Sequence, residues 1–534
     1  MLIEDYAAEG RSLGRWQGKV VFVERTVPGD IVDVFLFKNK KDWAEGYPLV
    51  FHQLSPSRVQ PFCSHFGDCG GCQWQMVSYE QQLQFKQQQV KDALQRIGKI
   101  PLPEILPIVG AKENRYYRNK LEYTFGTYRY IPESEWSSHP PKQMPPPTPP
   151  REGVWNPNGD ETLKQGFDEG STSLKEEHYK ISQSSQTPPL GGRGAEYHKI
   201  SESIQNPPSG GRRAGGPGGA GFHAKGLWDK IVDIKKCYLQ AEPSNQVREV
   251  IREYAAANQL SYYDVRHHTG FLRNIQLRIC TTGEVMVNVI VGENALEKIE
   301  KLLSYLEQQV PAITTLLYTI NTKWNDSMHD LAPVIYSGKG YVTEKLEDFQ
   351  FKIGPKSFFQ TNTRQGEELY RIARDYAELT GKETVYDLYC GTGSIGIFVS
   401  KGAKKIIGVE MIEEAIEDAK ENAALNNLTA AEFYAGDVID ICNNDFFVAH
   451  GRPDVIITDP PRAGMHEKLV KKILDIAAPV VVYVSCNPAT QGRDLNLLGE
   501  KYEVTRIQPV DMFPHTQHIE NVVQLKLKKS LANL

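Results

Sequence analysis

Short apolar runs alternate with amphipathic, helix-like stretches through the C-terminal third of the chain. The runs that predict strands are 384–389, 405–410, 431–437, 454–459 and 480–485, followed by 504–510 and 521–527. Alternation of strands with helices predicts a doubly wound, mostly parallel sheet. The last two runs have no helical stretch between them, so they predict an antiparallel pair at the sheet edge. We therefore expect an α/β fold with a Rossmann-like domain over residues 346–534.

The middle of the chain mixes strands and helices without this regular alternation. Apolar residues at helical spacing predict a helix over 78–97, with Ser78 as its N-cap. Further helices are predicted over 243–258 and 294–309, and strands over 231–234, 273–280 and 284–291. These elements predict a central α+β domain made of residues 59–130 and 221–345.

Residues 131–220 differ from the rest in composition. They include 14 Pro and 13 Gly, a proportion typical of low-complexity sequence. Within them KISQSSQTPPLGGR (180–193) recurs as KISESIQNPPSGGR (199–212), but neither copy has an apolar face that could stack into a repeat array. We expect a disordered insertion.

The first 58 residues contain short strands separated by turn residues. Apolar runs at 19–24, 31–37 and 49–54, with a Pro-Gly-Asp turn at 28–30, predict a small OB-like β-barrel. With EG at 9–10 and FVERTVPGD at 22–30, the segment resembles the TRAM module, an RNA-binding barrel attached to several RNA-modifying enzymes. The alternative is a barrel that only packs against its neighbour.

Composition limits the broad class of the protein. A length of 534 residues predicts three or four domains, and 40% apolar with 24% charged residues excludes collagen-like, coiled-coil and wholly disordered chains. The net charge of -5 does not fit a protein that coats nucleic acid by charge alone. Neither a secretory signal nor an apolar run long enough to span a membrane is present. We expect a cytoplasmic monomer without a membrane or DNA partner.

One stretch is locally basic. Residues 86–120 hold eight Lys or Arg against three Asp or Glu, with Tyr116 and Tyr117 among them. Basic side chains interleaved with aromatic rings suit contact with RNA phosphates and bases, while a solvated helix face is an equally good interpretation.

A glycine-rich loop predicts a nucleotide-type cofactor. Gly391, Gly393 and Gly396 follow a predicted strand and open a helix, and the next strand ends at Glu410, which can accept hydrogen bonds from ribose. Asp437, at the end of the third strand, is placed to meet an adenine edge. The pattern alone allows NAD or another adenosyl ligand. Asp387 before the first glycine, and DPPR at 459–462, favour S-adenosylmethionine.

Cys486 suggests the reaction. It follows the fifth strand, at the sheet edge where open α/β proteins bind ligands. Carbon 5 of uracil is a poor nucleophile, but a thiolate that adds to C6 makes C5 carbanion-like. After methyl transfer a base must remove the C5 proton, and Glu520 is our choice for it. His515 and His518 could orient the loop. A buried inert thiol is the alternative for Cys486, and the small residue Cys390 is expected to be one.

Several motifs together resemble one enzyme family. SFFQTN (357–362), DLYCGTGSIG (387–396), DPPRAG (459–464), SCNP (485–488) and FPHTQHIE (513–520) are similar to the RNA uracil-C5 methyltransferases, and most similar to their TRAM-bearing 23S ribosomal RNA branch. The resemblance implies that Gln360, Tyr389, Glu410 and Asp459 contact S-adenosylmethionine, that Cys486 is the nucleophile and that Glu520 accepts the proton. It also implies that the target base is flipped out of the RNA.

A second cysteine group predicts a metal site. Cys63, Cys69 and Cys72 form C-x5-C-x2-C, and Cys237 is the obvious fourth thiolate. Four thiolates suit zinc or an iron-sulfur cluster, and spacing leaves the choice open. The resemblance implies a [4Fe-4S] cluster with a structural role, tying Cys237 to the N-terminal group across the insertion.

Other functions remain possible at the level of the sequence. Transfer RNA is the nearest alternative substrate to 23S ribosomal RNA. Amino-group methylation through DPPR would not need Cys486. A non-catalytic RNA-binding ribosome assembly factor would bind RNA and never methylate it, although Cys486 and Glu520 together argue against such a loss of activity.

Overall fold

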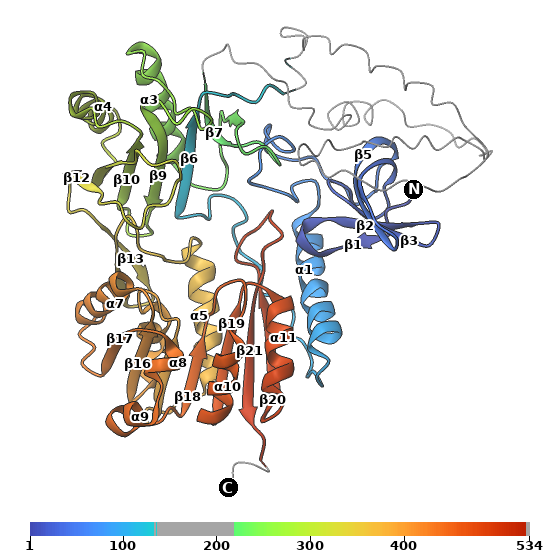
Figure 1. Ribbon diagram of the computed structural model, residues 1–534, viewed down its shortest axis with the longest axis vertical. Helices are drawn as coiled ribbons and strands as arrows, with labels where there is room; N and C mark the ends of the chain where they lie inside the picture. The colour runs from blue at the N-terminus through green and yellow to red at the C-terminus, as the bar shows by residue number, and fades with distance from the viewer. Residues whose placement is uncertain (133–134, 136–217, 530–534) are drawn as a thin grey trace, which may run out of the picture.

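The computed structural model describes residues 1–132, 135 and 218–529, which form three sheets and a separate hairpin (Figure 1). The disorder predicted for residues 131–220 falls almost entirely outside the described residues. At the C-terminal end of this range, strand β7 begins at Gly219, so Gly219 and Ala220 are not disordered as predicted. Among the described residues, no helix combines the length and apolar character needed to cross a membrane.

The C-terminal sheet has the predicted doubly wound form. Its strand order is β17-β16-β15-β18-β19-β21-β20. The strands are β15 (Thr384–Leu388), β16 (Lys405–Glu410), β17 (Ala431–Ala435), β18 (Val455–Thr458), β19 (Val480–Ser485), β20 (Tyr502–Val510) and β21 (Glu520–Leu527). The first five are parallel, and β21 pairs antiparallel with both β19 and β20. This arrangement confirms the predicted antiparallel pair at the edge.

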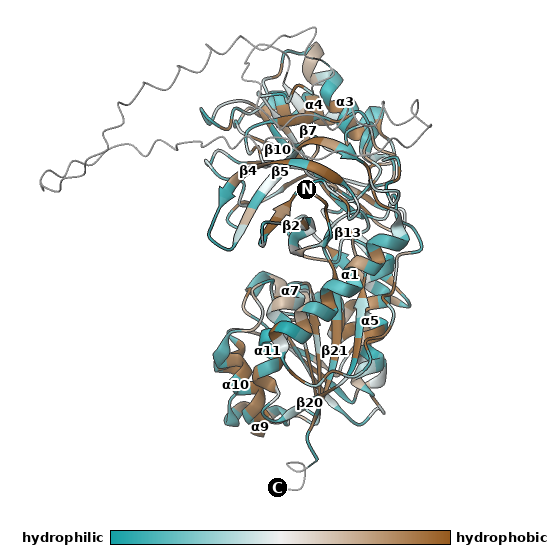
Figure 2. Cartoon of the chain, turned by 90° about the vertical axis from the view of Figure 1, so that its right-hand side faces the viewer, coloured by the Kyte–Doolittle hydropathy of each residue, from teal (hydrophilic) through white to brown (hydrophobic). Residues whose placement is uncertain are grey.

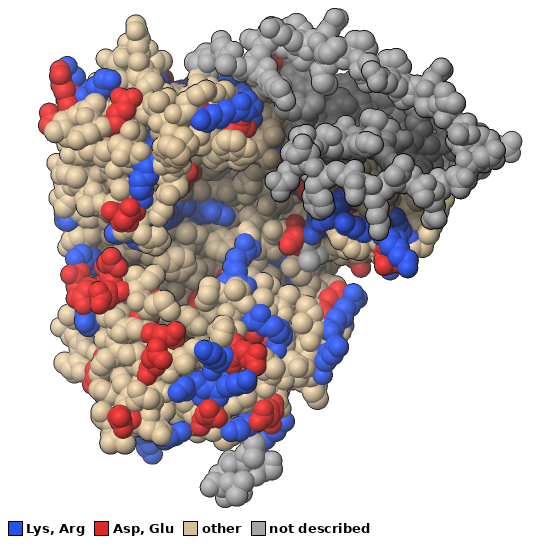
Figure 3. All heavy atoms as spheres, viewed as in Figure 1, with Lys and Arg blue, Asp and Glu red and all other residues tan. Residues whose placement is uncertain are grey.

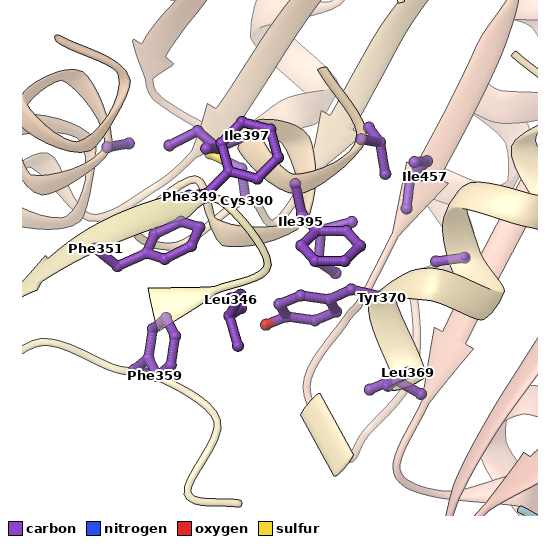
Figure 4. Close-up of a cluster of buried hydrophobic side chains, with 14 of the residues drawn as sticks. Leu346, Phe349, Phe351, Phe359, Leu369, Tyr370, Cys390, Ile395, Ile397 and Ile457 are labelled. Atoms are coloured by element: carbon purple, nitrogen blue, oxygen red, sulfur yellow. The ribbon is translucent and has the colours of Figure 1, made fainter. Parts of the chain in front are cut away.

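Helices bury both faces of this sheet. They are α5 (Thr363–Ala377), α6 (Ser394–Val399) and α7 (Glu413–Leu425) on one face, and α10 (Glu467–Ile476) and α11 (Pro488–Leu498) on the other. The hairpin β13 (Val342–Leu346) and β14 (Phe349–Ile353) packs with α5 and α6, and their aromatic and aliphatic side chains meet in one cluster (Figure 4). Short helices α8 (Val438–Ile441) and α9 (Asn444–His450) follow β17.

An N-terminal helix completes the second face. Helix α1 (Tyr79–Ala93) begins after Ser78, whose hydroxyl accepts the N–H of Gln81, and a further turn continues it over Leu94–Gly98. Val90 and Leu94 are fully buried against the C-terminal sheet. Figure 2 shows α1 lying beside α11 with hydrophilic residues on its outer surface. Helix α1, although it precedes the central sheet in the sequence, is therefore part of the helical layer on the C-terminal sheet.

The central sheet has the order β12-β11-β10-β9-β6-β7-β8. Its strands are β6 (Lys120–Gly126), β7 (Gly219–His223), β8 (Ile231–Asp233), β9 (Leu272–Ile279), β10 (Val285–Val291), β11 (Thr315–Ile320) and β12 (Val334–Ser337). One face packs against α3 (Ser244–Ala257) and α4 (Leu296–Gln309). Strands β6 and β7 pair directly, so the residues on either side of the 131–220 segment are neighbours in one sheet.

The N-terminal sheet has five strands in the order β1-β2-β3-β5-β4. They are β1 (Asp5–Tyr6), β2 (Ser12–Trp16), β3 (Lys19–Val23), β4 (Ile31–Asn39) and β5 (Trp43–Gln53). A bridge between Leu2 and Ile31 joins the two edges of the sheet. Val23 and Val32 lie in its small core, fully buried.

Candidate active site

The proposed catalytic residues meet at the carboxyl edge of the C-terminal sheet. Cys486 directly follows β19, and Glu520 is the first residue of β21. Because Ser485 pairs with Asn521 in the antiparallel ladder, the next residues outward, Cys486 and Glu520, are also neighbours. This edge faces the central sheet (Figure 1), and Figure 3 shows the surface hollowed between the two parts of the molecule.

The carboxyl groups of Asp459 and Glu520 lie beside Cys486, and that of Asp387 lies near Asp459. Burial raises the pKa of Asp459 to about 7 and that of Asp387 to about 7. Burial raises the pKa of Glu520 well above its usual range, and the nearby charge of Asp459 raises it further. Buried carboxylates of like charge repel each other, so a cation placed among them would favour their ionised forms.

Asp387 shows where such a cation fits. Its Oδ2 atom accepts a hydrogen bond from the N–H of Gly396 at 2.8 Å. Its Oδ1 atom is buried and has no partner in the described part of the chain. A buried polar atom is normally satisfied, so an orphaned carboxylate oxygen indicates a missing partner. The positively charged methionine end of S-adenosylmethionine supplies a suitable donor.

The glycine loop is open on the side where a ligand would lie. A Cβ atom added to Gly391 would meet nothing within 4 Å, whereas one added to Gly396 would lie 2.9 Å from Ile406 and 3.0 Å from Asp387. Gly391 also adopts a φ of 53°, which side chains rarely tolerate. Gly391 thus leaves room for a ligand, and Gly396 allows the helix to pack closely on the sheet.

The other expected cofactor contacts surround this loop. Glu410 accepts the N–H groups of Gly391, Met411 and Ile412, and Asp437 caps α8 by accepting the N–H of Ile439. Tyr389 is partly buried, and burial raises its pKa, with further contributions from the nearby charges of Asp437 and Glu410. Gln360 is 7% exposed and lies between β14 and α5. Cys390 is buried, as expected.

The Cys486 thiol is protonated in its resting surroundings. Burial, together with the charges of Glu520 and Asp459, raises its pKa to about 11, and Arg462 opposes this effect. Arg462 also lowers the pKa of Glu520, so it is a cation that acts on both proposed catalytic groups. In the sequence, Arg462 is marked only as the fourth residue of DPPR.

The two histidines near Glu520 have different surroundings. The Nδ1 atom of His518 lies 2.7 Å from the guanidinium of Arg462, so His518 can orient that cation. His515 is 5% exposed and is hydrogen-bonded within the protein. Burial lowers the pKa of each to about 4, so both rings are neutral near pH 7.

The prediction of an RNA surface over residues 86–120 is wrong for two of its side chains, those of Lys86 and Tyr117. Lys86 is fully buried and forms an ion pair with Asp511 at 2.6 Å. Tyr117 is 8% exposed, and its hydroxyl donates to the carbonyl of Pro514. Lys120 is partly buried on β6, and burial lowers its pKa. Tyr116 remains 40% exposed and could still meet a base.

The second cysteine group lines a single cavity of about 350 Å³ between the N-terminal segment and the central sheet. Cys63, Cys69, Cys72 and Cys237 all contribute to its wall. Burial raises the pKa of each thiol, and for Cys69, Cys72 and Cys237 the proximity of other thiols raises it further. Within the described residues, no group of three or more His, Cys, Asp or Glu is arranged to hold a metal ion. The cavity nevertheless has room for a multi-atom group among the four thiols.

Comparison with known proteins places the chain in a family. The family model for tRNA (uracil-5-)-methyltransferase matches residues 334–528. An uncharacterized RNA methyltransferase from Bacteroides thetaiotaomicron is 43% identical over 525 residues, which cover 98% of this chain and 100% of that protein. An uncharacterized RNA methyltransferase from Porphyromonas gingivalis is 42% identical over 529 residues, covering 98% of this chain and 99% of that protein.

The likeness extends to a solved structure. The crystal structure of Pyrococcus abyssi tRNA (uracil-54, C5)-methyltransferase in complex with S-adenosyl-L-homocysteine matches 98% of this chain and 99% of its own, with a TM-score of 0.65 and 25% sequence identity. The fold, the glycine loop and the full-length similarity all point to the same family. The chain belongs to the S-adenosylmethionine-dependent RNA uracil-C5 methyltransferases.

Proposed function

We propose that this enzyme forms 5-methyluridine in 23S ribosomal RNA through a covalent bond between Cys486 and C6 of the target uracil. The observation that carries the proposal is the adjacency of Cys486 and Glu520 at the ends of the paired strands β19 and β21. A nucleophile and a base on neighbouring strands can reach the two adjacent ring carbons of one base.

The reaction requires two roles from the chain's own residues. The Cys486 sulfur, once deprotonated, forms a bond to C6, and the ring electrons move toward C5 and O4. S-Adenosylmethionine supplies the methyl group that C5 takes up. The Glu520 carboxylate then removes the C5 proton, the electron pair reforms the C5–C6 double bond, and the Cys486 sulfur leaves as thiolate.

Arg462 has a clear electrostatic role in this scheme. Its charge lowers the pKa of both Cys486 and Glu520, which favours the thiolate and the carboxylate that the two steps need. His518 holds the guanidinium through its Nδ1 atom. The neutral state of His518 follows from its burial.

We further propose that the cofactor is held by Gln360, Tyr389, Gly391, Glu410, Asp437 and Asp459. The open side of Gly391 and the clustered acidic side chains support this assignment. Asp387 joins the set because its free Oδ1 atom suits a cationic donor. From the sequence alone, Asp387 indicates which cofactor is favoured and not that it contacts the cofactor.

The four cysteines are proposed to hold a [4Fe-4S] cluster, with zinc as the alternative. The shared cavity supports a group larger than one ion. The cluster would supply a covalent link between Cys237 and the segment of Cys63, Cys69 and Cys72, on opposite sides of the 131–220 segment. Its role in this proposal is structural.

The proposed RNA target is 23S ribosomal RNA. Three domains of the chain suit a large folded RNA. They are a TRAM-like module of residues 1–58, a central domain of residues 59–130 and 221–345, and a catalytic domain of residues 346–534. Transfer RNA is the second candidate, because the similar Pyrococcus enzyme acts on tRNA uracil 54.

The experiment is methyl incorporation from labelled S-adenosylmethionine into unmodified 23S ribosomal RNA and tRNA transcripts. Wild-type protein should label the ribosomal transcript, and Cys486→Ala protein should label neither. Labelling of the tRNA transcript alone would make tRNA, and not 23S ribosomal RNA, the substrate. Methylation by Cys486→Ala protein would exclude the covalent route and favour amino-group chemistry through Asp459.

A further inference from the structure

The loop that carries the proposed base is supported from a distant part of the chain. Residues 511–519 connect β20 to β21 and end at Glu520. Several of their hydrogen bonds go to residues between 73 and 86, just before α1 or within it, more than 400 positions earlier in the sequence. In Figure 1 this loop rises from the C-terminal sheet toward the start of α1.

His515 is the central point of this junction. Its carbonyl accepts the N–H groups of Gln73 at 2.9 Å and Trp74 at 3.1 Å. Its own N–H donates to the Oε1 atom of Gln82 at 2.9 Å. His515 has a φ of 65°, a conformation that a non-glycine residue keeps only when its surroundings impose it.

Gln82 joins the two sides of the junction. It is fully buried, and its Nε2 atom donates to the carbonyls of Trp74 and Val77, each at 2.9 Å. With the bond from His515, both the nitrogen and the oxygen of its amide group have partners. A buried amide with its partners in place holds a unique arrangement, because losing one leaves the others unsatisfied.

Gln73 adds a link to the cysteine cavity. Its side-chain Oε1 accepts the N–H of Gln517 at 3.2 Å, and it directly follows Cys72 in the chain. The segment that lines the cysteine cavity therefore ends at the groups that hold the loop of the base. This arrangement gives the cysteine segment a function beyond its own local fold.

We propose that Gln82 is a positioning residue for the methyl-transfer reaction: it fixes the His515 loop so that the Glu520 carboxylate reaches the C5 proton of the methylated uracil. The proposal rests on the proposed roles of Cys486 and Glu520. The first step, attack by Cys486, uses a residue at the end of β19, and the loop contributes to it only through His518, which contacts Arg462. Loss of Gln82 should therefore impair elimination more than adduct formation.

The test compares Gln82→Leu protein with wild type on the unmodified transcript that the wild type methylates. Protein bound covalently to RNA is measured on denaturing gels, with the rates of methyl incorporation and C5 tritium release. We expect release to fall about 10- to 100-fold, as for a misplaced base, while covalent adduct accumulates. KM for S-adenosylmethionine should stay near the wild-type value.

Gln84→Leu is the matched control, because Gln84 lies on the exposed face of the same helix and should behave as wild type. If Gln82→Leu protein does not fold, Gln73→Ala removes only the bond to Gln517 and should show the same pattern more weakly. Equal loss of adduct and release, or no change, would overturn the inference. Wild-type protein that transfers methyl groups without releasing tritium would instead overturn the proposed function and, with it, this inference.

Discussion

Replacing Asp387 by Asn should have opposite effects on cofactor affinity and on the stability of the ligand-free protein. The Asn side chain can still accept the Gly396 N–H with its oxygen, so the bond at 2.8 Å is retained. Its other end then presents an amide donor where the carboxylate had offered the free Oδ1 atom. A cationic ligand group would lose a charged acceptor and meet an N–H group instead.

The magnitudes follow from the burial of this carboxyl group. A hydrogen bond to a charged group contributes about 1.5–3 kcal/mol, so S-adenosylmethionine should bind about 10- to 150-fold more weakly. Burial raises the pKa of Asp387 from 3.8 to about 7, so its ionisation destabilises the empty fold by up to roughly 4 kcal/mol. This penalty is absent below pH 3.8, grows as the pH rises toward 7, and is complete above that value.

Titration calorimetry with S-adenosylmethionine and thermal unfolding at pH 5 and pH 8 test both effects. The Asp387→Asn protein should bind more weakly, and its ligand-free unfolding temperature should rise more at pH 8 than at pH 5. Asp475→Asn, an exposed change on α10, is the matched control. Unchanged affinity in the Asp387→Asn protein would refute the assignment of Oδ1 to a cationic ligand group.

Three further predictions concern other parts of the molecule. Because the pKa of Cys486 is about 11, kcat/KM for RNA should rise about tenfold per pH unit from pH 6 to 9. The Arg462→Ala change should lower kcat/KM at each pH. A flat pH profile would contradict a thiolate nucleophile. Lys86→Met leaves the buried carboxylate of Asp511 without its ion-pair partner and should destabilise the fold by about 3–5 kcal/mol, measured by urea unfolding. Lys91→Met, an exposed change on the same helix, is the control. Equal free energies of unfolding for the two variants would count against this prediction. Anaerobically purified wild-type protein should hold about four irons per chain, and Cys237→Ser protein should hold fewer; full iron content in the variant would remove Cys237 from the site.

Much of the C-terminal fold could be predicted from the sequence. Strands of a parallel sheet are buried on both faces, so β15, β16 and β19 are nearly continuous apolar runs that stand out from the helices. The hairpin of β13 and β14 was not predicted, because its short strands mix polar and apolar residues.

The candidate site was predictable where its residues lie in local motifs. Cys486, Asp459 and Glu520 each follow or begin a strand at one sheet edge, which topology alone brings together. The contact of Gln82 with His515 has no local signal, since it joins residues 433 positions apart. Lys86 was misinterpreted for a related reason: a basic residue on a helix looks solvent-exposed until its buried partner is known.

The most direct test of the central claim is tritium release from 23S ribosomal RNA transcripts labelled at uridine C5, using anaerobically purified protein and S-adenosylmethionine. Wild-type protein should release tritium in proportion to the methyl groups transferred, and Cys486→Ala protein should release none. Methyl transfer by wild-type protein without tritium release would contradict C5 chemistry, and release that persists in Cys486→Ala protein would contradict the role of the thiol.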